Sequence, residues 1–344
     1  MFLSLFLLAI ILFMGMSSFS RKASRALSSS SSHSRRTAGP VLEEVDWENN
    51  GANAKIAIIS LEGVIQGRSV ESGKYGLVQL VRAQFAEAAD DAHVKAVIFK
   101  IDSPGGEVLA SDDISRIIKD FQRLTKKPVI ACMGNLAASG GYYVAAPCRW
   151  IVANEMTITG SIGVIMSTYN YRGLMDKVGV TPVTFKSGRF KDMLSGKRDP
   201  KEIPPEEQAM MQSMIDETYS KFKRVVEDGR EQAFTSNEKL KQKGRKLSAD
   251  WANYADGRIL TGTEAFTYGF VDELGDFRDA VDRAESLIGV KGCNLIEYEQ
   301  HYEWSDFLRM FGKSEAKQIK VDLGFDSPRL QTGRLYFLAP MFAQ

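Results

Sequence analysis

Two short segments contain the groups that acyl-transfer chemistry requires, a serine hydroxyl and unobstructed backbone N–H groups. Residues 102–106 (DSPGG) and 138–141 (ASGG) each follow an apolar run and precede a helical pattern. The two glycines of the first segment allow its turn to donate hydrogen bonds to a developing oxyanion. Ser139 stands at a predicted helix start, which favours developing negative charge, and the Gly140 N–H can join an oxyanion hole. The alternatives are an ordinary strand-to-helix turn and an N-cap role for Ser139.

A serine hydroxyl needs a base before it can attack a carbonyl carbon. The three histidines lie without a triad partner in sight; they are His33, His93 and His301. Lysine is the other option, although its ordinary pKa of about 10.4 must be lowered by burial before it acts as a base near neutral pH. The candidates lie in residues 185–193 (FKSGRFKDM), where the residues alone do not choose between Lys186 and Lys191.

Neutral hydroxyl groups are suited to holding such a lysine in a largely apolar pocket. Residues 159–164 (TGSIGV) supply small hydroxyls in a predicted turn. Ser161 is the residue of this turn that we consider for orienting the lysine amine.

The composition excludes several other classes of function. A net charge of +1 gives no field that favours nucleic acid or an acidic partner. The cysteines are odd in number and lack CxxC spacing, which argues against a zinc site or a disulfide framework, although a single bridge is possible. We expect them to be small buried hydrophobic residues; they are Cys132, Cys148 and Cys293.

The elements that must position these segments alternate between strand and helix. Apolar, β-branched runs predict strands at 55–65, 95–101, 128–133 and 150–152. Apolar residues at helical spacing predict helices at 77–92 and around Ile114, Ile117, Ile118 and Phe121. This alternation is typical of βαβ units around a mostly parallel sheet with flanking helices, an α/β fold.

A long helix is predicted after Pro204-Pro205, from Glu206 to about Glu231, because prolines suit a helix start. Its methionine-rich apolar positions are typical of a core or a subunit interface. The basic stretch 239–246 is typical of a solvated face, with membrane or partner contact as the alternative.

The chain begins with an almost wholly apolar run, residues 2–19, just long enough to cross a bilayer as a helix. No Lys or Arg precedes it and no clear A-x-A pattern follows, which favours a retained anchor over a cleaved signal peptide. We therefore expect an anchor at 1–20, a flexible Ser-rich linker at 21–52, a folded domain at 53–290 and a C-terminal extension at 291–344.

Taken together and in order, these segments resemble the signal peptide peptidase A family, Ser/Lys peptidases of family S49 with a ClpP/crotonase-like fold. The shared pieces are DSPGG (102–106), ASGGYY (138–143), TGSIGV (159–164), KSGRFKD (186–192), ADGR (255–258), TG (261–262) and GFVD (269–272). Each piece is short, but their common order across roughly residues 55–290 makes the resemblance specific.

The resemblance implies a role for each candidate residue. Ser139 matches the nucleophile, and Lys191 matches the general base. Gly106 matches an oxyanion-hole donor, Gly140 is the expected second donor, and Ser161 matches the hydroxyl that positions the lysine. No metal or cofactor is implied. In this family the serine and the lysine can come from neighbouring copies, so one motif set per chain implies a homo-oligomer with active sites at subunit interfaces.

The implied activity is that of a membrane-anchored serine endopeptidase that degrades remnant signal peptides or other hydrophobic peptides through an acyl-enzyme. A crotonase-type acyl-CoA hydratase and a non-catalytic membrane scaffold are the alternatives, and the intact Ser139 and Lys191 argue against both. The resemblance implies a single-pass protein of the cell membrane with an extracytoplasmic catalytic domain. The basic residues after the apolar run point to the opposite orientation by the positive-inside rule.

Overall fold

The computed structural model describes residues 39–67, 75–300 and 335–339. Its strands are β1 (Leu42–Glu48), β2 (Lys55–Glu62), β3 (Val94–Ser103), β4 (Gly105–Glu107), β5 (Val129–Ala137), β6 (Trp150–Ala153), β7 (Ile158–Gly160), β8 (Ile259–Thr261), β9 (Glu273–Leu274), β10 (Asn294–Gln300) and β11 (Tyr336–Leu338). Nine of these described strands form one sheet with the order β1-β10-β2-β3-β5-β6-β9, in which β7 pairs with β5 and with β8. The other two, β4 and β11, pair with each other.

The sheet is mostly parallel, as the sequence predicts. Every pair from β10 to β9 along this order is parallel, whereas the edge strand β1 runs antiparallel to β10. Strand β3 (VKAVIFKIDS) is buried along most of its length, because both faces of a parallel sheet are covered by other elements. The predicted strands at 55–65, 95–101, 128–133 and 150–152 are thus confirmed as β2, β3, β5 and β6.

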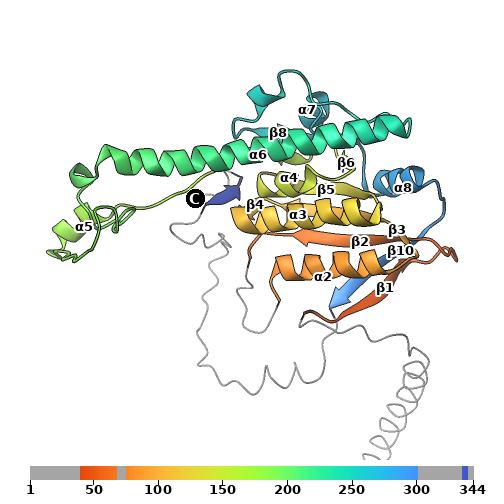
Figure 1. The fold of residues 1–344 in the computed structure, drawn as a ribbon, viewed down its shortest axis with the longest axis horizontal. Helices are drawn as coiled ribbons and strands as arrows, with labels where there is room; N and C mark the ends of the chain where they lie inside the picture. Colours follow the sequence, from red (N-terminus) through yellow and green to blue (C-terminus); the bar gives the residue numbers. More distant parts are fainter. Residues whose placement is uncertain (1–38, 68–74, 301–334, 340–344) are drawn as a thin grey trace, which may run out of the picture. The chain divides into compact units, whose positions relative to one another are not determined.

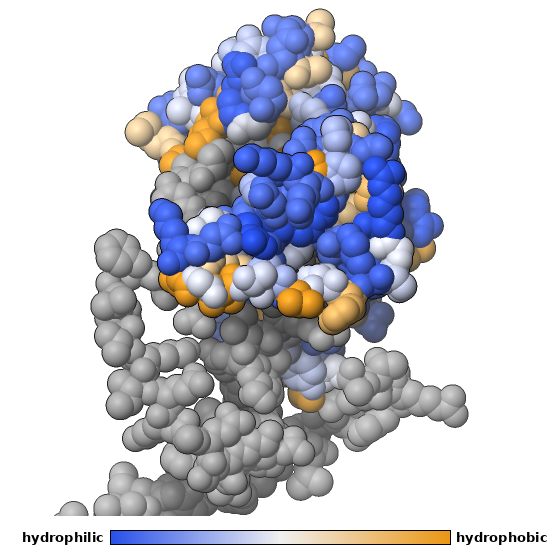
Figure 2. All heavy atoms as spheres, turned by 90° about the vertical axis from the view of Figure 1, so that its left-hand side faces the viewer, coloured by the Kyte–Doolittle hydropathy of each residue, from blue (hydrophilic) through white to orange (hydrophobic). Residues whose placement is uncertain are grey.

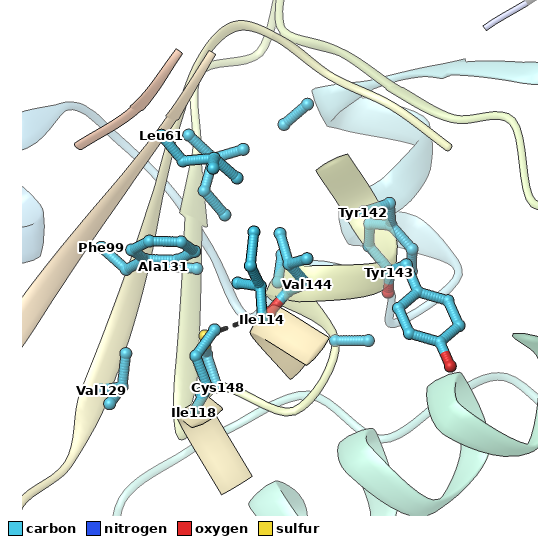
Figure 3. Close-up of a cluster of buried hydrophobic side chains, with 14 of the residues drawn as sticks. Leu61, Phe99, Ile114, Ile118, Val129, Ala131, Tyr142, Tyr143, Val144 and Cys148 are labelled. Atoms are coloured by element: carbon cyan, nitrogen blue, oxygen red, sulfur yellow. Dashed lines mark hydrogen bonds between the residues drawn. The ribbon is translucent and has the colours of Figure 1, made fainter. Parts of the chain in front are cut away.

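Helices cover the two faces of the sheet. The described helices are α2 (Leu77–Asp90), α3 (Val108–Thr125), α4 (Gly140–Ala145), α5 (Arg172–Lys177), α6 (Pro205–Lys239), α7 (Gly262–Thr267) and α8 (Phe277–Ile288), with short 3₁₀ turns at Pro200–Glu202 and Trp251–Tyr254; all but α5 contribute buried residues. Along β2, Ala57 and Ile59 belong to the apolar cluster shared with α2, α3, α4 and α6, whereas Ile56 and Ile58 belong to the cluster shared with α8. Figure 3 shows part of the larger cluster, with Phe99 of the sheet and Ile114 of α3 among its side chains.

One segment lies apart from the sheet. Residues 166–204, which we call the arm, include α5, and the arm and the first part of α6 lie beyond one end of the sheet (Figure 1). α5 has no buried residue, and apart from Glu207 the buried residues of α6 begin at Phe222. The arm exposes large apolar side chains, including Phe185 with 94% of its surface accessible. Figure 2, which views the molecule from the arm's side, shows hydrophobic patches among mostly hydrophilic side chains.

Three strands lie outside residues 53–290, the folded domain that the sequence predicts. β1 falls within the expected linker 21–52, and β10 and β11 fall within the expected extension 291–344. β1 pairs with β10 from Leu42↔Gln300 onward, and β10 pairs with β2, so both belong to the main sheet. The prediction of a linker is therefore wrong for Leu42–Glu48, because partner strands about 250 residues away give these polar residues their structure.

The cysteines and the long helix agree with the predictions from the sequence. The three cysteines are free and buried, as expected. The long predicted helix is present and continues to Lys239. Within the described ranges no helix is long and apolar enough to span a membrane. The apolar run 2–19 and most of the predicted linker lie outside the described residues, as do His33 and His301.

Candidate active site

Ser139 occupies the junction between β5 and α4 in a backbone conformation that side chains rarely adopt. Its φ of 54° and ψ of −115° are unusual for a residue other than glycine, and such conformations cost of order 1–3 kcal/mol and cluster at active sites. The side chain makes no capping hydrogen bond, so the N-cap alternative is wrong. Its Oγ is buried and has no hydrogen-bond partner among the described residues. A buried hydroxyl without a partner is costly for stability and is available for chemistry.

The backbone around Ser139 is held from three sides. The Ser139 N–H donates to the carbonyl oxygen of Gly160 at 2.9 Å, and the Ala138 N–H donates to that of Ser103 at 3.1 Å. The N–H of Tyr143 donates to the Ser139 carbonyl at 2.8 Å, which forms the first turn of α4. These bonds tie the serine to the ends of β3 and β7.

The two glycine-rich segments meet at the serine. A Cβ placed on Gly140 would lie 3.0 Å from the nitrogen of Gly106 and 2.7 Å from Oγ of Ser111. A Cβ on Gly105 would lie 2.6 Å from the nitrogen of Gly140. The structure therefore brings the predicted donors Gly106 and Gly140 together, in a space too narrow for any side chain.

The orientation of the Gly106 N–H follows from its neighbours. The Ile65 N–H donates to the Gly105 carbonyl, and the Glu107 N–H donates to the Ile65 carbonyl, at 2.9 and 2.8 Å. Because successive backbone groups of a strand point to opposite edges, the Gly106 N–H faces the edge of β4 away from Ile65. This is the edge on which β11 lies (Figure 1).

The C-terminal strand β11 covers this edge and is a feature that the sequence analysis missed. It pairs antiparallel with β4, with Phe337 opposite Gly106, while Tyr336 and Ile165 exchange two backbone hydrogen bonds of 3.1 Å. The Phe337 side chain is buried and contacts the rings of Tyr143 and Phe222, with centroids 4.8 and 4.6 Å away. An extended peptide thus lies across the predicted oxyanion donor. The only sequence signal was the apolar character of the last residues.

Ser161 directly follows Gly160, whose carbonyl oxygen accepts the hydrogen bond from the Ser139 N–H. It is buried and, like Gly160 before it, has a positive φ, 51° against 73°. Its N–H donates to the carbonyl of Arg258 at 2.6 Å, so the ADGR segment supports this turn. The structure therefore places the backbone of Ser161 directly after the residue that is bonded to the Ser139 N–H.

Lys191 is not brought to Ser139 within one chain. It is exposed, it lies in the arm, and Ser139 Oγ contacts no donor or acceptor in the described residues. Lys186 differs from Lys191 in its contacts: its Nζ donates to Oδ1 of Asp192 at 2.7 Å and to the carbonyl of Arg189 at 3.2 Å. The Lys186 amine is therefore held by groups of its own loop.

A buried ion pair supports the far end of α4 and had no predicted role. Arg230 of α6 and Asp272 are both fully buried and bonded to each other. Arg230 also donates to the carbonyls of Ala146 and Cys148, at 3.2 and 3.0 Å. The GFVD motif contains Asp272, but nothing in its residue types pointed to a partner on a helix 42 positions earlier.

The chain is similar to known proteins over much of its length. Residues 122–291, which include Ser139, Ser161 and Lys191, match the family model described as Peptidase family S49. The chain is 35% identical over 262 residues to a putative signal peptide peptidase SppA of Enterococcus faecium, covering 75% of this chain and 71% of that protein. It is 41% identical over 204 residues to a putative protease of Synechocystis sp., covering 59% and 67%. It is 32% identical over 254 residues to the chloroplastic serine protease SPPA of Arabidopsis thaliana, covering 72% of this chain and 35% of that protein.

Proposed function

The chain belongs to peptidase family S49, and on that premise we propose that it is a serine endopeptidase that pairs Ser139 with Lys191 of a neighbouring copy. The observation that carries this proposal is the buried, unpartnered Ser139 Oγ on a strained backbone beside the Gly106 and Gly140 amides. A mostly parallel sheet with a short helix after the serine is in keeping with the ClpP/crotonase-like fold that the sequence resemblance implies.

In the proposed reaction, Ser139 Oγ gives its proton to the neutral Lys191 amine and attacks the scissile carbonyl carbon. The carbonyl oxygen becomes an oxyanion that accepts hydrogen bonds from the N–H groups of Gly106 and Gly140. The lysine then protonates the departing amine, which leaves an acyl-enzyme. Water, deprotonated by the same lysine, releases the acyl group and restores the serine. The Ser161 hydroxyl orients the amine throughout.

A neighbouring copy is needed because a lysine acts as a base only in surroundings that disfavour its charge. Lys191 is exposed in the single chain and does not contact Ser139. The apolar side chains exposed on the arm, among them Tyr169, Val183 and Phe185, are suited to packing against a second copy. We therefore infer a homo-oligomer in which each arm delivers its lysine to the next chain.

The substrate is proposed to take the place of β11 on β4. Main-chain hydrogen bonds to a strand edge accept any sequence in extended form, and side-chain pockets add preference. The pocket that holds Phe337, formed with Tyr143 and Phe222, favours an apolar side chain. Apolar peptides, including remnant signal peptides, fit this preference. Residues 2–19 would anchor the enzyme in the cell membrane beside such substrates, with an extracytoplasmic catalytic domain.

Cleavage of a fluorogenic apolar peptide by the full-length protein tests the proposal. Ser139→Ala and Lys191→Ala are each expected to abolish cleavage, whereas Lys186→Ala retains most of it. Mixing the two inactive variants as dissociated subunits and reassembling them should restore activity, because about a quarter of random neighbouring pairs then combine an intact serine with an intact lysine. Full activity of Lys191→Ala would refute the dyad, and a mixture that stays inactive would refute the shared site.

A further inference from the structure

Glu207 is a buried carboxylate in a part of the molecule that buries little else. It lies in the first turn of α6, directly after the arm, with only 4% of its surface accessible. Its neighbour Glu206 is exposed and pairs across the surface with Arg189, whose side chain is 63% accessible. Carboxylates are rarely buried unless they are paired, so the hydrogen-bond partners of Glu207 indicate its structural role.

Both carboxylate oxygens of Glu207 hold the loop that contains the lysine. Oε1 accepts a hydrogen bond from the Leu194 N–H at 3.1 Å, and Oε2 accepts one from the Arg198 guanidinium at 2.6 Å. Leu194 has a φ of 61°, a conformation that a leucine keeps only when its surroundings impose it. The loop from Lys186 to Arg198 therefore depends on Glu207 for its backbone path.

The contacts continue from Glu207 to the residue next to Lys191. Arg198 lies 3.6 Å from Oδ1 of Asp192 and donates to the carbonyl of Glu202 at 2.9 Å. Asp192 in turn pairs with Lys186 at 2.7 Å, and this hydrogen bond holds the pKa of Asp192 below its usual range. The network thus occupies Lys186 and leaves the amine of Lys191 outside it.

The same helix connects this network to the domain that contains Ser139. α6 is continuous from Glu207 to Arg230, about 35 Å at 1.5 Å per residue. At Gly229 it approaches α4 so closely that a Cβ would lie 2.5 Å from the Ala146 carbonyl oxygen. The loop from Lys186 to Arg198 is therefore attached to a continuous helix that packs against the domain at its other end.

We propose that Glu207 is a positioning residue for the general base: it sets the loop so that Lys191 of one chain reaches Ser139 of the next. This inference rests on the proposed Ser/Lys function. A merely stabilising ion pair is the competing explanation. The two explanations predict different effects of a Glu207 substitution in a mixed oligomer. If Glu207 positions the lysine, the substitution lowers activity only when it is in the chain that donates Lys191.

The first experiment compares Glu207→Ala with Glu206→Ala, its exposed neighbour, in the full-length oligomer. Glu207→Ala is expected to lower kcat about 10- to 100-fold with KM nearly unchanged, since a displacement of about 1 Å at a catalytic group has such an effect. It should also displace the pH at which kcat/KM is half-maximal. Glu206→Ala should leave kcat and KM within twofold of the wild-type values. Glu207→Gln, whose amide oxygen still accepts the Leu194 N–H, should recover much of the lost rate.

The decisive experiment places Glu207→Ala in only one kind of subunit of the reassembled mixture. In the Ser139→Ala chain, which donates the lysine, it should lower the restored activity by the same factor; in the Lys191→Ala chain it should have no effect. An equal loss from either chain, or wild-type kcat for Glu207→Ala in the uniform oligomer, would overturn the inference. A mixture inactive without Glu207→Ala refutes the shared site instead, and the uniform oligomer still decides the role of Glu207.

Discussion

The Ser139 amide donates a hydrogen bond to the carbonyl oxygen of Gly160, 2.9 Å away, and both residues have a positive φ. The proposed nucleophile is thereby fastened to the turn that contains Ser161. This bond joins two segments whose bonded residues are 21 positions apart in the sequence, so a change in the turn should affect the serine.

Gly160→Ala is expected to reduce kcat at least tenfold and to lower the melting temperature. Its Cβ would lie 3.0 Å from Leu260 and 3.1 Å from the Arg258 carbonyl, at a φ of 73° that disfavours alanine. Gly257→Ala is the matched control, because its φ is 92° but no atom lies within 4 Å of the added Cβ. The control should lose about 1 kcal/mol of stability and keep its activity. Equal kinetic losses in the two variants would mean that the turn does not position the serine.

Gly140→Ala tests the oxyanion hole. The new methyl group would press on Ser111 and on the nitrogen of Gly106, which would separate the two donors. Loss of one such donor reduces kcat by about 10²–10³-fold, and we expect an effect of this size with KM little changed. Gly173→Ala, in the exposed helix α5 with no atom near its Cβ, should behave as wild type in steady-state kinetics. A Gly140→Ala enzyme with normal kcat would exclude Gly140 from the hole.

Phe337→Ala tests whether β11 occupies the substrate edge of β4. Loss of the ring contacts with Tyr143 and Phe222 should release the strand and raise kcat/KM several-fold on an apolar peptide. The loss of unfolding free energy should be smaller than the 3–5 kcal/mol that is typical of a core phenylalanine such as Phe99, because a released strand leaves no cavity. Denaturant unfolding of Phe337→Ala and Phe99→Ala makes this comparison. Unchanged or lower kcat/KM for Phe337→Ala would show that β11 is only a structural strand.

The stability of the domain should depend on Asp112 at acid pH. Burial raises the pKa of this carboxyl, but hydrogen bonds from Lys221 and Tyr143 outweigh that effect, so its pKa lies below the ordinary value. A lowered folded-state pKa stabilises the fold above the unfolded pKa of about 3.9, and this contribution is lost as the pH falls through the folded pKa. The melting temperature of wild type should therefore exceed that of Asp112→Asn at neutral pH, and the difference should shrink below about pH 4. A difference that does not vary with pH would contradict this assignment.

The sequence by itself determined the local elements and supplied the candidate nucleophile. Apolar periodicity identified β2, β3, β5 and α6, because the burial of a strand or a helix face follows from residues close in the chain. The same local pattern made Ser139 a candidate, and the family resemblance assigned it the role of nucleophile. The choice of Lys191 over Lys186 came from the family resemblance. The structure adds only that Lys186 is paired with Asp192.

Tertiary structure alone decided what depends on distant partners. The polar residues of β1 form a strand because β10, about 250 positions later, offers its edge, and no local pattern signals such a pairing. The same holds for β11 on β4, for Arg230 with Asp272, and for Glu207 with the loop of Lys191. Each of these pairings satisfies backbone or charged groups that folding removes from water, and the partner that satisfies them is set by the path of the whole chain.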